Sequence, residues 1–407
     1  MRTHKIVIKI PTIAQILLYV LVFSLLLSSG TVYQYLNNQR AIARLIDYLP
    51  IFILFLLIIL QRPALINEGK GKIELIILGS IAYFSVLALA NGSNPLSVTA
   101  TLMYLSLMLY YFYYYDRYEL NILRIYRNYI VILAFVSLIL WILGCILHKI
   151  PGQYVDQTWG GYKDVTSYFM IQFEREKTLL GGVVITSNRS IFVERAFAAY
   201  NFLIGLLYEL IIEKKKSLAR ILVMTVAILS TVSITGLILI IILYFLYFIA
   251  NGNNKKVVFA LKVLFVPVVI FTVVVTIKFL LVDKLSYGYS AISRSNDFSN
   301  GIRAWKESPI WGYGYGNSKE IAERFNAGTS NSVSSILTQG GVLLLVPYIL
   351  IFLKAYINCI QYKIINMAVF TSVFAIYLIF TVVAFRNITI YILLVIGFSN
   401  IAYYSRD

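Results

Sequence analysis

Charged residues are scarce in this chain, and their scarcity argues against an ordinary soluble fold. Only 13% of the 407 residues are charged and 60% are hydrophobic, whereas a soluble domain usually has about a quarter charged residues. The apolar residues come in long runs, which are typical of membrane spans. Nearly every fifty-residue window contains such a run, so no stretch of soluble-domain size is left over.

Several chemical signals are also absent. The chain has two cysteines, Cys145 and Cys359, at opposite ends of different apolar runs, which disfavours a disulfide. No Walker loop occurs, so a nucleotide-binding domain of that type is excluded. No apolar run has a convincing charged residue at its centre, where an ion-coupled transporter commonly needs one. Glu209 and Lys278 lie near the ends of runs, where long side chains can snorkel.

The apolar runs themselves predict helices. Ile51–Leu60 is apolar on every face, which favours a helix over the alternating strands of a membrane barrel. The basic N-terminus precedes an apolar run without a clear cleavage site, so we expect a retained first span. We therefore predict an all-α polytopic membrane protein with about twelve spans, at 12–29, 47–61, 73–90, 97–115, 128–147, 196–212, 219–234, 235–250, 258–281, 341–354, 366–384 and 388–404. One bent helix in place of the seventh and eighth would make eleven.

Loop charge predicts the orientation. The short loops on one side carry most of their charge as Lys and Arg, which marks that side as cytoplasmic; they include Arg62, Lys70, Lys72, Arg117, Arg124, Arg127, Lys214, Lys215, Lys216, Arg220, Lys255 and Lys256. We expect residues 1–407 to form one integral domain of the cytoplasmic membrane with both termini inside. Two long outer loops then follow, at 148–195 and 282–340.

These outer loops are basic too, and the net charge of the chain is +17. Long loops escape the positive-inside rule, so one interpretation is that basic residues are simply tolerated in these loops. The other is an anionic ligand at the outer face, because the planar fork of Arg donates paired hydrogen bonds to phosphate. The residues concerned are Lys149, Lys163, Arg175, Lys177, Arg189, Arg195, Lys284, Arg294, Arg303, Lys306, Lys319, Arg324 and, between the last two spans, Arg386.

The second outer loop contains a distinctive glycine-rich segment. Arg303 and Trp305 precede Pro309, and the segment then runs Gly312-Tyr-Gly-Tyr-Gly316, with Gly340-Gly341 at the next span. Alternating glycines do not form a stable helix, and they let backbone approach a ligand closely. Aromatic rings between them can stack on sugars. An ordinary glycine-rich turn between two amphipathic surface helices is the alternative.

This segment resembles the signature loop of the O-antigen polymerase and O-antigen ligase superfamily. The family pattern has an Arg, a Trp two residues on, Pro followed by alternating glycines, and a polar patch before a Gly-initiated span. In the first outer loop, the segment from Arg189 to Glu194 resembles an element of capsule and O-antigen polymerases in which an Arg is followed by Phe-x-Glu-Pro. In this chain Arg195 stands in place of the Pro. Ligases typically have His before Asn in the polar patch, where this chain has Ser330-Asn331, and this favours a polymerase.

The resemblance implies a GT-C-like glycosyltransferase that works without a metal or other cofactor. Its substrates would be an undecaprenyl-pyrophosphate-linked oligosaccharide donor and acceptor, with membrane lipid, a chain-length regulator and a flippase as partners, and no nucleic acid. The product would be O-antigen, as in lipopolysaccharide, capsule or exopolysaccharide. Cations would stabilise the pyrophosphate leaving group. We predict Glu194, Arg189 and Arg303 as catalytic, and as substrate-binding residues Arg195, Arg294, Arg386, Trp305, Tyr313, Tyr315 and Asn331.

Three other functions fit the same sequence features. An O-antigen ligase would transfer a finished glycan to its final acceptor. A lipid-linked oligosaccharide flippase would also use cations and many spans, but would be expected to place the cations inside the bundle and to have short outer loops. A non-catalytic scaffold of the same assembly pathway is the third alternative.

Overall fold

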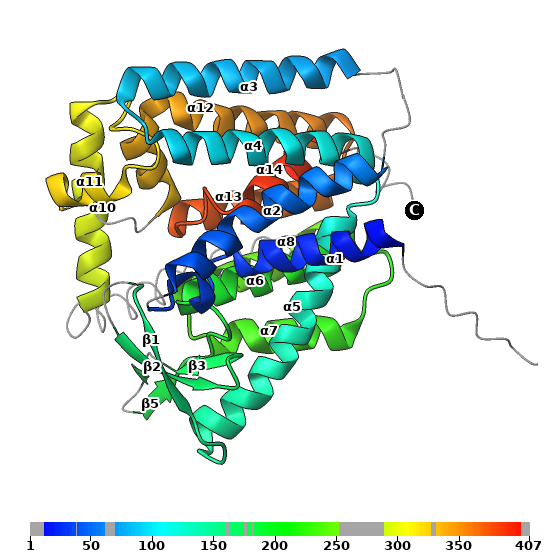
Figure 1. Cartoon of the computed structure of the whole chain (residues 1–407). Helices are drawn as coiled ribbons and strands as arrows, with labels where there is room; N and C mark the ends of the chain where they lie inside the picture. The colour runs from blue at the N-terminus through cyan, green and yellow to red at the C-terminus, as the bar shows by residue number, and fades with distance from the viewer. Residues whose placement is uncertain are drawn as a thin grey trace, which may run out of the picture.

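The computed structural model describes residues 12–37, 39–61, 70–159, 163–174, 177–180, 183–251, 289–326 and 331–399. Its main body is a bundle of apolar helices (Figure 1). They are α1 (Ile13–Leu27), α2 (Arg40–Gln61), α3 (Lys70–Asn91), α4 (Pro95–Tyr111), α5 (Asn121–Leu140), α6 (Arg195–Leu207), α7 (Leu218–Ser230), α8 (Ile234–Asn251), α12 (Ser332–Gln361), α13 (Ile365–Phe380) and α14 (Asn387–Phe398). Short π-helical turns extend three of them: η2 (Phe112–Asp116), η3 (Trp141–Ile146) and η4 (Tyr208–Ile212).

Seven of these helices are long and apolar enough to cross a membrane, and the protein is therefore a polytopic helical membrane protein. They are α2, α3, α8, α12 and, with their π-helical extensions, α4, α5 and α6. The other four, α1, α7, α13 and α14, are shorter apolar helices. The predicted ninth span, 258–281, lies outside the described residues, so the count of twelve stays a prediction.

The seventh and eighth predicted spans are separate helices. Helix α7 ends at Ser230 and α8 begins at Ile234, with a turn between them in which Val232 has a φ of 49°. The alternative of one bent helix in this region is therefore wrong.

Helix α12 differs from its predicted span. It covers Ser332–Gln361 instead of 341–354, and its first nine residues belong to the segment predicted as an outer loop. At Gly341 the φ and ψ angles are 61° and −158°, so the helix is broken there. A break in the helix leaves backbone N–H and C=O groups without intrahelical partners.

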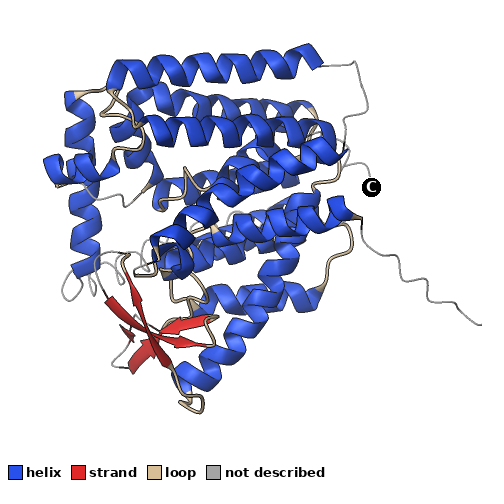
Figure 2. Ribbon diagram, viewed as in Figure 1, coloured by secondary structure: helices blue, strands red, loops and turns tan. Residues whose placement is uncertain are grey.

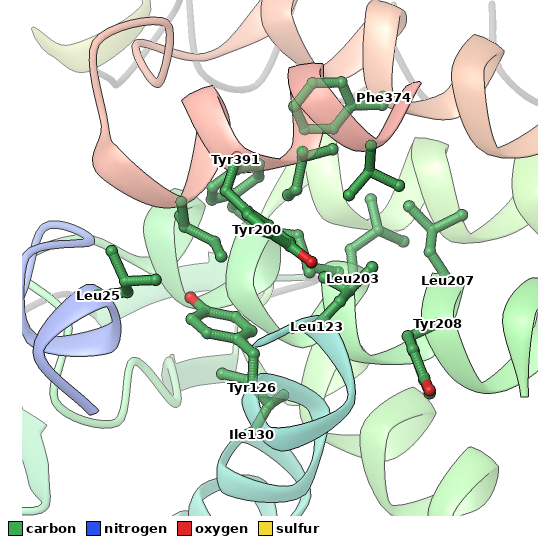
Figure 3. Packing of buried hydrophobic residues seen from close by; sticks show 14 of the residues in the cluster. Leu25, Leu123, Tyr126, Ile130, Tyr200, Leu203, Leu207, Tyr208, Phe374 and Tyr391 are labelled. Atoms are coloured by element: carbon green, nitrogen blue, oxygen red, sulfur yellow. The ribbon is translucent and has the colours of Figure 1, made fainter. Parts of the chain in front are cut away.

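Helix α6 lies at the centre of the bundle. Of its membrane-spanning window, 83% is buried, against 11% for the peripheral helix α3. Figure 3 shows how α6 packs: Tyr200 and Leu203 face Leu123 and Tyr126 of α5 and Tyr391 of α14. The N-terminus of α6, where the first predicted motif ends, is therefore held by the core.

The first predicted outer loop contains strands, which the sequence did not predict (Figure 2). Strands β1 (Gln153–Gln157), β2 (Lys163–Tyr168) and β3 (Gln172–Glu174) form an antiparallel sheet in the order β1-β2-β3. Strands β4 (Lys177–Leu180) and β5 (Val183–Thr186) form a separate hairpin. These strands are three to six residues long, too short for a clear alternation of polar and apolar residues.

The second predicted outer loop contains two helices, α10 (Tyr289–Glu307) and α11 (Ser318–Phe325). Helix α10 runs across the direction of the bundle helices at one end of them, and α11 lies beside it (Figure 1). We call this end, with β1–β5, α10, α11 and residues 381–386, the loop end. The glycine-rich segment joins α10 to α11, as expected for the alternative interpretation of a turn between two surface helices.

The prediction that Glu209 snorkels is wrong. Its side chain is fully buried and forms an ion pair with Arg127 of α5. Glu213 bonds the same guanidinium at 2.7 Å, and the Ser217 N–H donates to Glu209 Oε1 at 2.8 Å. A buried carboxylate needs such partners because it has lost its hydration, and only the packing of α5 against α6 and η4 brings Arg127 to it.

Candidate functional site

The first predicted motif forms a tight turn in which Arg189 is an anchor. Its side chain is fully buried, with Nε donating to the Phe173 carbonyl at 3.0 Å and Nη1 to the Val193 carbonyl at 2.8 Å. The Ser190 N–H donates to Gln172 Oε1 at 2.9 Å, and Ser190 has a φ of 51°. Arg189 thus joins the turn to strand β3, and its predicted contact with a pyrophosphate stays a prediction.

The segment after α1 holds the other side of this turn. The Val32 N–H donates to the Ile191 carbonyl at 2.8 Å, and the Val193 N–H donates to the Gly30 carbonyl at 3.0 Å. The two segments form a small antiparallel bridge between Thr31 and Phe192. Because the turn is fixed on both sides, the residue that follows it has a defined position.

That residue is Glu194, the N-cap of α6. Its Oε1 accepts a hydrogen bond of 2.7 Å from the indole Nε1 of Trp159, and the side chain is half-buried. The positive end of the α6 dipole favours a carboxylate here. The predicted base is therefore partly accessible and lies at the loop end.

Arg386 lies in the same group of side chains. Its Nη2 donates to the Tyr35 hydroxyl at 3.2 Å, and its guanidinium carbon lies 5.1 Å from the centroid of the Phe197 ring. The Trp159 ring lies 4.7 Å from Tyr35 and 5.8 Å from Phe197, measured between centroids. These contacts close a ring of four residues, to which Glu194 is attached through Trp159. We call the five residues together the loop-end cluster: Tyr35, Trp159, Glu194, Phe197 and Arg386.

A second carboxylate lies near this cluster. Asp47 of α2 accepts a hydrogen bond of 2.6 Å from Gln34 Nε2, and it lies within electrostatic range of Arg386. Sequence reasoning missed Asp47 as well as Tyr35 and Trp159. Trp159 offered one signal, because it is an aromatic residue in a predicted outer loop. Nothing in the sequence links Asp47 to Arg386, which is more than three hundred residues away.

The glycine-rich segment forms a different kind of structure. The N–H groups of Tyr313 and Gly314 donate to the carbonyls of Thr338 and Gln339 at 2.8 and 2.9 Å. In the other direction, the Val342 N–H donates to the Pro309 carbonyl at 2.9 Å. The segment thereby supplies partners for backbone groups that the break in α12 leaves free.

The close approach of the two backbones explains two of the glycines. A Cβ on Gly312 would lie 2.5 Å from the Gly340 nitrogen, and a Cβ on Gly341 would lie 2.2 Å from the Ile310 carbonyl oxygen. Both residues also have a positive φ, 66° and 61°, which disfavours an L side chain. The backbone of α12 approaches Gly312, and the backbone of the glycine-rich segment approaches Gly341.

The aromatic residues of this segment are engaged in the protein. Tyr315 is only 8% exposed, and its hydroxyl lies 3.0 Å from the Thr101 hydroxyl. The Tyr313 hydroxyl donates to Glu307 at 3.0 Å, and the Trp305 indole donates to the Pro309 carbonyl at 3.0 Å. Trp305 and Tyr313 remain half-exposed, so of the three Tyr315 has the least surface for a sugar.

The remaining predicted residues lie around this segment. Arg303 is exposed on α10 and donates to the Phe325 carbonyl at 3.1 Å. Asn331 is the N-cap of α12, where its side chain accepts from the Ser334 N–H at 2.7 Å. Arg195 is the half-buried first residue of α6. Arg294 is in α10, and its side chain lies outside the described part of the chain.

The turn formed by residues 381–386 connects the two predicted motifs. On one side, the Ser332 hydroxyl at the start of α12 accepts hydrogen bonds from the N–H groups of Val383 and Ala384. Phe385 packs edge-on against Tyr315 with their centroids 5.2 Å apart. On the other side, Arg386 enters the loop-end cluster. The motifs are therefore joined through a third segment, which the sequence marked only by Arg386.

In the described part of the chain, no three His, Cys, Asp or Glu residues come together to form a group that could hold a metal ion. No family model, curated protein or solved structure matches this sequence or its fold. The geometry at the loop end is thus what bears on function.

Proposed function

We propose that the protein is a glycosyltransferase that polymerises undecaprenyl-pyrophosphate-linked oligosaccharide repeat units into a surface polysaccharide. The observation that carries the proposal is the loop-end cluster, in which a partly accessible carboxylate and a guanidinium are held together by aromatic rings. An acceptor hydroxyl needs a base, a sugar needs an aromatic platform, and a departing pyrophosphate needs a cation.

Each cluster residue has a separate task in this proposal. Glu194 takes the proton of the acceptor hydroxyl as the new sugar–oxygen bond forms. Arg386 faces the pyrophosphate that leaves with the electrons of the broken sugar–oxygen bond, and the exposed Arg303 is a second cation for it. Trp159 and Tyr35 hold the sugar ring, and Trp159 also orients Glu194.

Arg189 acts through Glu194 in this scheme. Because its guanidinium bonds the carbonyls of Phe173 and Val193, it fixes the turn that precedes α6. It is therefore a positioning residue for the predicted base. The glycine-rich segment supports the site from the other side by holding the broken helix α12 and the turn at 381–386.

The test is chain elongation by the purified full-length protein supplied with lipid-linked repeat units. Replacement Glu194→Gln keeps the size of the side chain and the hydrogen bond from Trp159, and it should lower the rate about 10²-fold or more. Replacement Arg386→Lys keeps the charge without the planar fork and should cause a smaller loss. Glu307→Gln is the matched control, since that carboxylate bonds Tyr313 outside the cluster.

Three results would overturn the proposal. Ladders of normal length from Glu194→Gln would remove the predicted base. Absence of elongation by the wild type, together with movement of lipid-linked oligosaccharide across vesicle membranes, would favour the flippase. If polymerisation continues in a deletion strain but the glycan fails to reach its final acceptor, the protein is a ligase.

A further inference from the structure

A polar cavity lies at the end of the bundle opposite the loop end. Its volume is about 200 Å³, and Arg117, Asn358, Cys359, Tyr362 and Ser399 are among its lining residues. They come from the turn after η2, from the C-terminal part of α12 and the turn after it, and from the end of α14. No residue of the loop-end cluster lines it, so the proposed reaction does not use this cavity.

Arg117 is the cation of this cavity. Its guanidinium carbon lies 4.7 Å from the ring centroids of both Tyr113 and Tyr118. Aromatic rings can occupy the faces of a guanidinium, while its N–H groups point outward along its edge. The Nε atom of Arg117 is enclosed, and it has no hydrogen-bond partner among the residues that the structure describes. A buried charged donor in this state is costly and calls for an acceptor.

No Asp or Glu among the described residues fills this need. None of the lining residues is Asp or Glu. The neighbouring Asp116 is engaged elsewhere: its carboxylate accepts from the N–H groups of Asn121 and Ile122 and from the Tyr391 hydroxyl. Among the described residues no carboxylate is left for Arg117, which leaves its place open to an anion from outside the chain.

A second cavity indicates what kind of anion fits. Phe398 lines the polar cavity and also a larger one, of about 410 Å³, between α3, α4, α12 and α14. That cavity is bounded mainly by aliphatic and aromatic side chains such as Leu394 and Ile351. Lys354 Nζ lies 3.8 Å from the centroid of the Phe398 ring, which adds a cation where the two cavities meet. A charged group next to a hydrocarbon chain is the chemistry of a lipid.

We propose that the polar cavity binds the phosphate of an anionic phospholipid, with one acyl chain running past Phe398 into the apolar cavity. Arg117 belongs to a loop that the sequence predicts to be cytoplasmic, and basic pockets between spans on that side bind anionic headgroups. The site is distinct from the loop-end cluster, and its occupancy is measured without any reference to catalysis.

Native mass spectrometry of the full-length protein, stripped of lipid in detergent, tests this site. We expect phosphatidylglycerol to be retained about tenfold more tightly than phosphatidylcholine with the same chains, because one charge-assisted contact is at stake. Arg117→Gln should abolish that preference. Arg124→Gln is the matched control, since Arg124 belongs to the same basic segment but does not line the cavity.

A second variant helps to distinguish loss of lipid binding from loss of folding. Ala355→Leu keeps Arg117 and fills the cavity, and it should also lower retention of phosphatidylglycerol. Equal retention of the two lipids by the wild type, or an unchanged preference in Arg117→Gln and Ala355→Leu, would overturn the proposal. Retention of inorganic phosphate in an Arg117-dependent manner, without any lipid preference, would assign the site to free phosphate and also reject the lipid.

Discussion

The two loop motifs each begin with an arginine, Arg189 or Arg303, but they differ in what they hold. The turn of Arg189 to Glu194 encloses its arginine and presents its carboxylate to a group of aromatic rings. The glycine-rich segment directs its backbone groups at the broken helix α12 and buries Tyr315. The first motif thus places Glu194 in the loop-end cluster, while the glycine-rich segment supplies hydrogen-bond partners at the break in a membrane helix.

A conspicuous sequence pattern can serve the hydrogen bonding of backbone groups as much as the binding of a ligand. Alternating glycines permit any close backbone approach, and here the partner is part of the same chain. In hydrocarbon surroundings, unpaired N–H and C=O groups are especially costly, so a broken helix needs such a partner.

The largest expected effect is on folding, and it concerns the glycine-rich segment. Gly312→Ala should prevent accumulation of monodisperse protein, because its φ of 66° costs about 1–2 kcal/mol for an L residue. The overlap of the new Cβ with the backbone at Gly340 adds to that cost. Fluorescence-detected size-exclusion chromatography in detergent measures the outcome. Gly79→Ala is the control, since nothing lies within 4 Å of a Cβ added there. A wild-type yield of Gly312→Ala would refute the close packing of the glycine-rich segment against α12.

Arg189→Met should be the next most damaging change. It removes a buried charged donor from two carbonyls, each such bond contributing about 1.5–3 kcal/mol. We expect a clear fall in the thermal midpoint in detergent, with activity lost as the turn before Glu194 loosens. Arg303→Met, on an exposed residue with one carbonyl contact, should shift the midpoint far less. A stable but inactive Arg189→Met would instead favour direct contact of Arg189 with substrate.

A moderate effect on rate should follow from Trp159→Phe. An aromatic ring stays, but the hydrogen bond to Glu194 is lost, so we expect about a fivefold lower elongation rate from a contact of about 1 kcal/mol. Trp141→Phe removes an indole bond to the Thr186 carbonyl outside the cluster and should leave the rate unchanged. Equal rates for both variants would separate Trp159 from the site.

The smallest expected effect is that of Tyr315→Phe. Loss of its hydrogen bond with Thr101 should lower stability by about 1 kcal/mol without changing the elongation rate. Thermal melting and the elongation assay together check this. A large loss of rate with unchanged stability would mean that Tyr315 contacts sugar, and the contrast between the two motifs would weaken.

Prediction from sequence succeeded where hydrophobic runs dominate. Eleven of the predicted spans coincide with apolar helices, because a long apolar run has few stable arrangements in lipid. The helix boundaries were less well predicted at α12, where the break at Gly341 allows helix on both sides of it. The short strands β1–β5 show no clear alternation of polar and apolar residues in the sequence.

For the candidate site, the sequence and its family resemblance included Glu194 and Arg386 among the ten predicted residues, and the structure places both in one cluster. They did not identify Tyr35, Trp159 or Asp47, because these residues come from three separate segments with ordinary local sequences. The burial of Arg189 was equally unreadable, since strand β3 and the Val193 carbonyl enclose it only after folding.

The sequence by itself determined that this is a helical membrane protein with two long, basic loop segments, because apolar length and loop charge act locally along the chain. Only the tertiary structure decided which polar residues serve the site and which serve the fold. That division depends on which groups are left without partners after the helices pack. In this protein α12 needs the glycine-rich segment and Glu209 needs Arg127, while Arg117 Nε has no hydrogen-bond partner among the described residues.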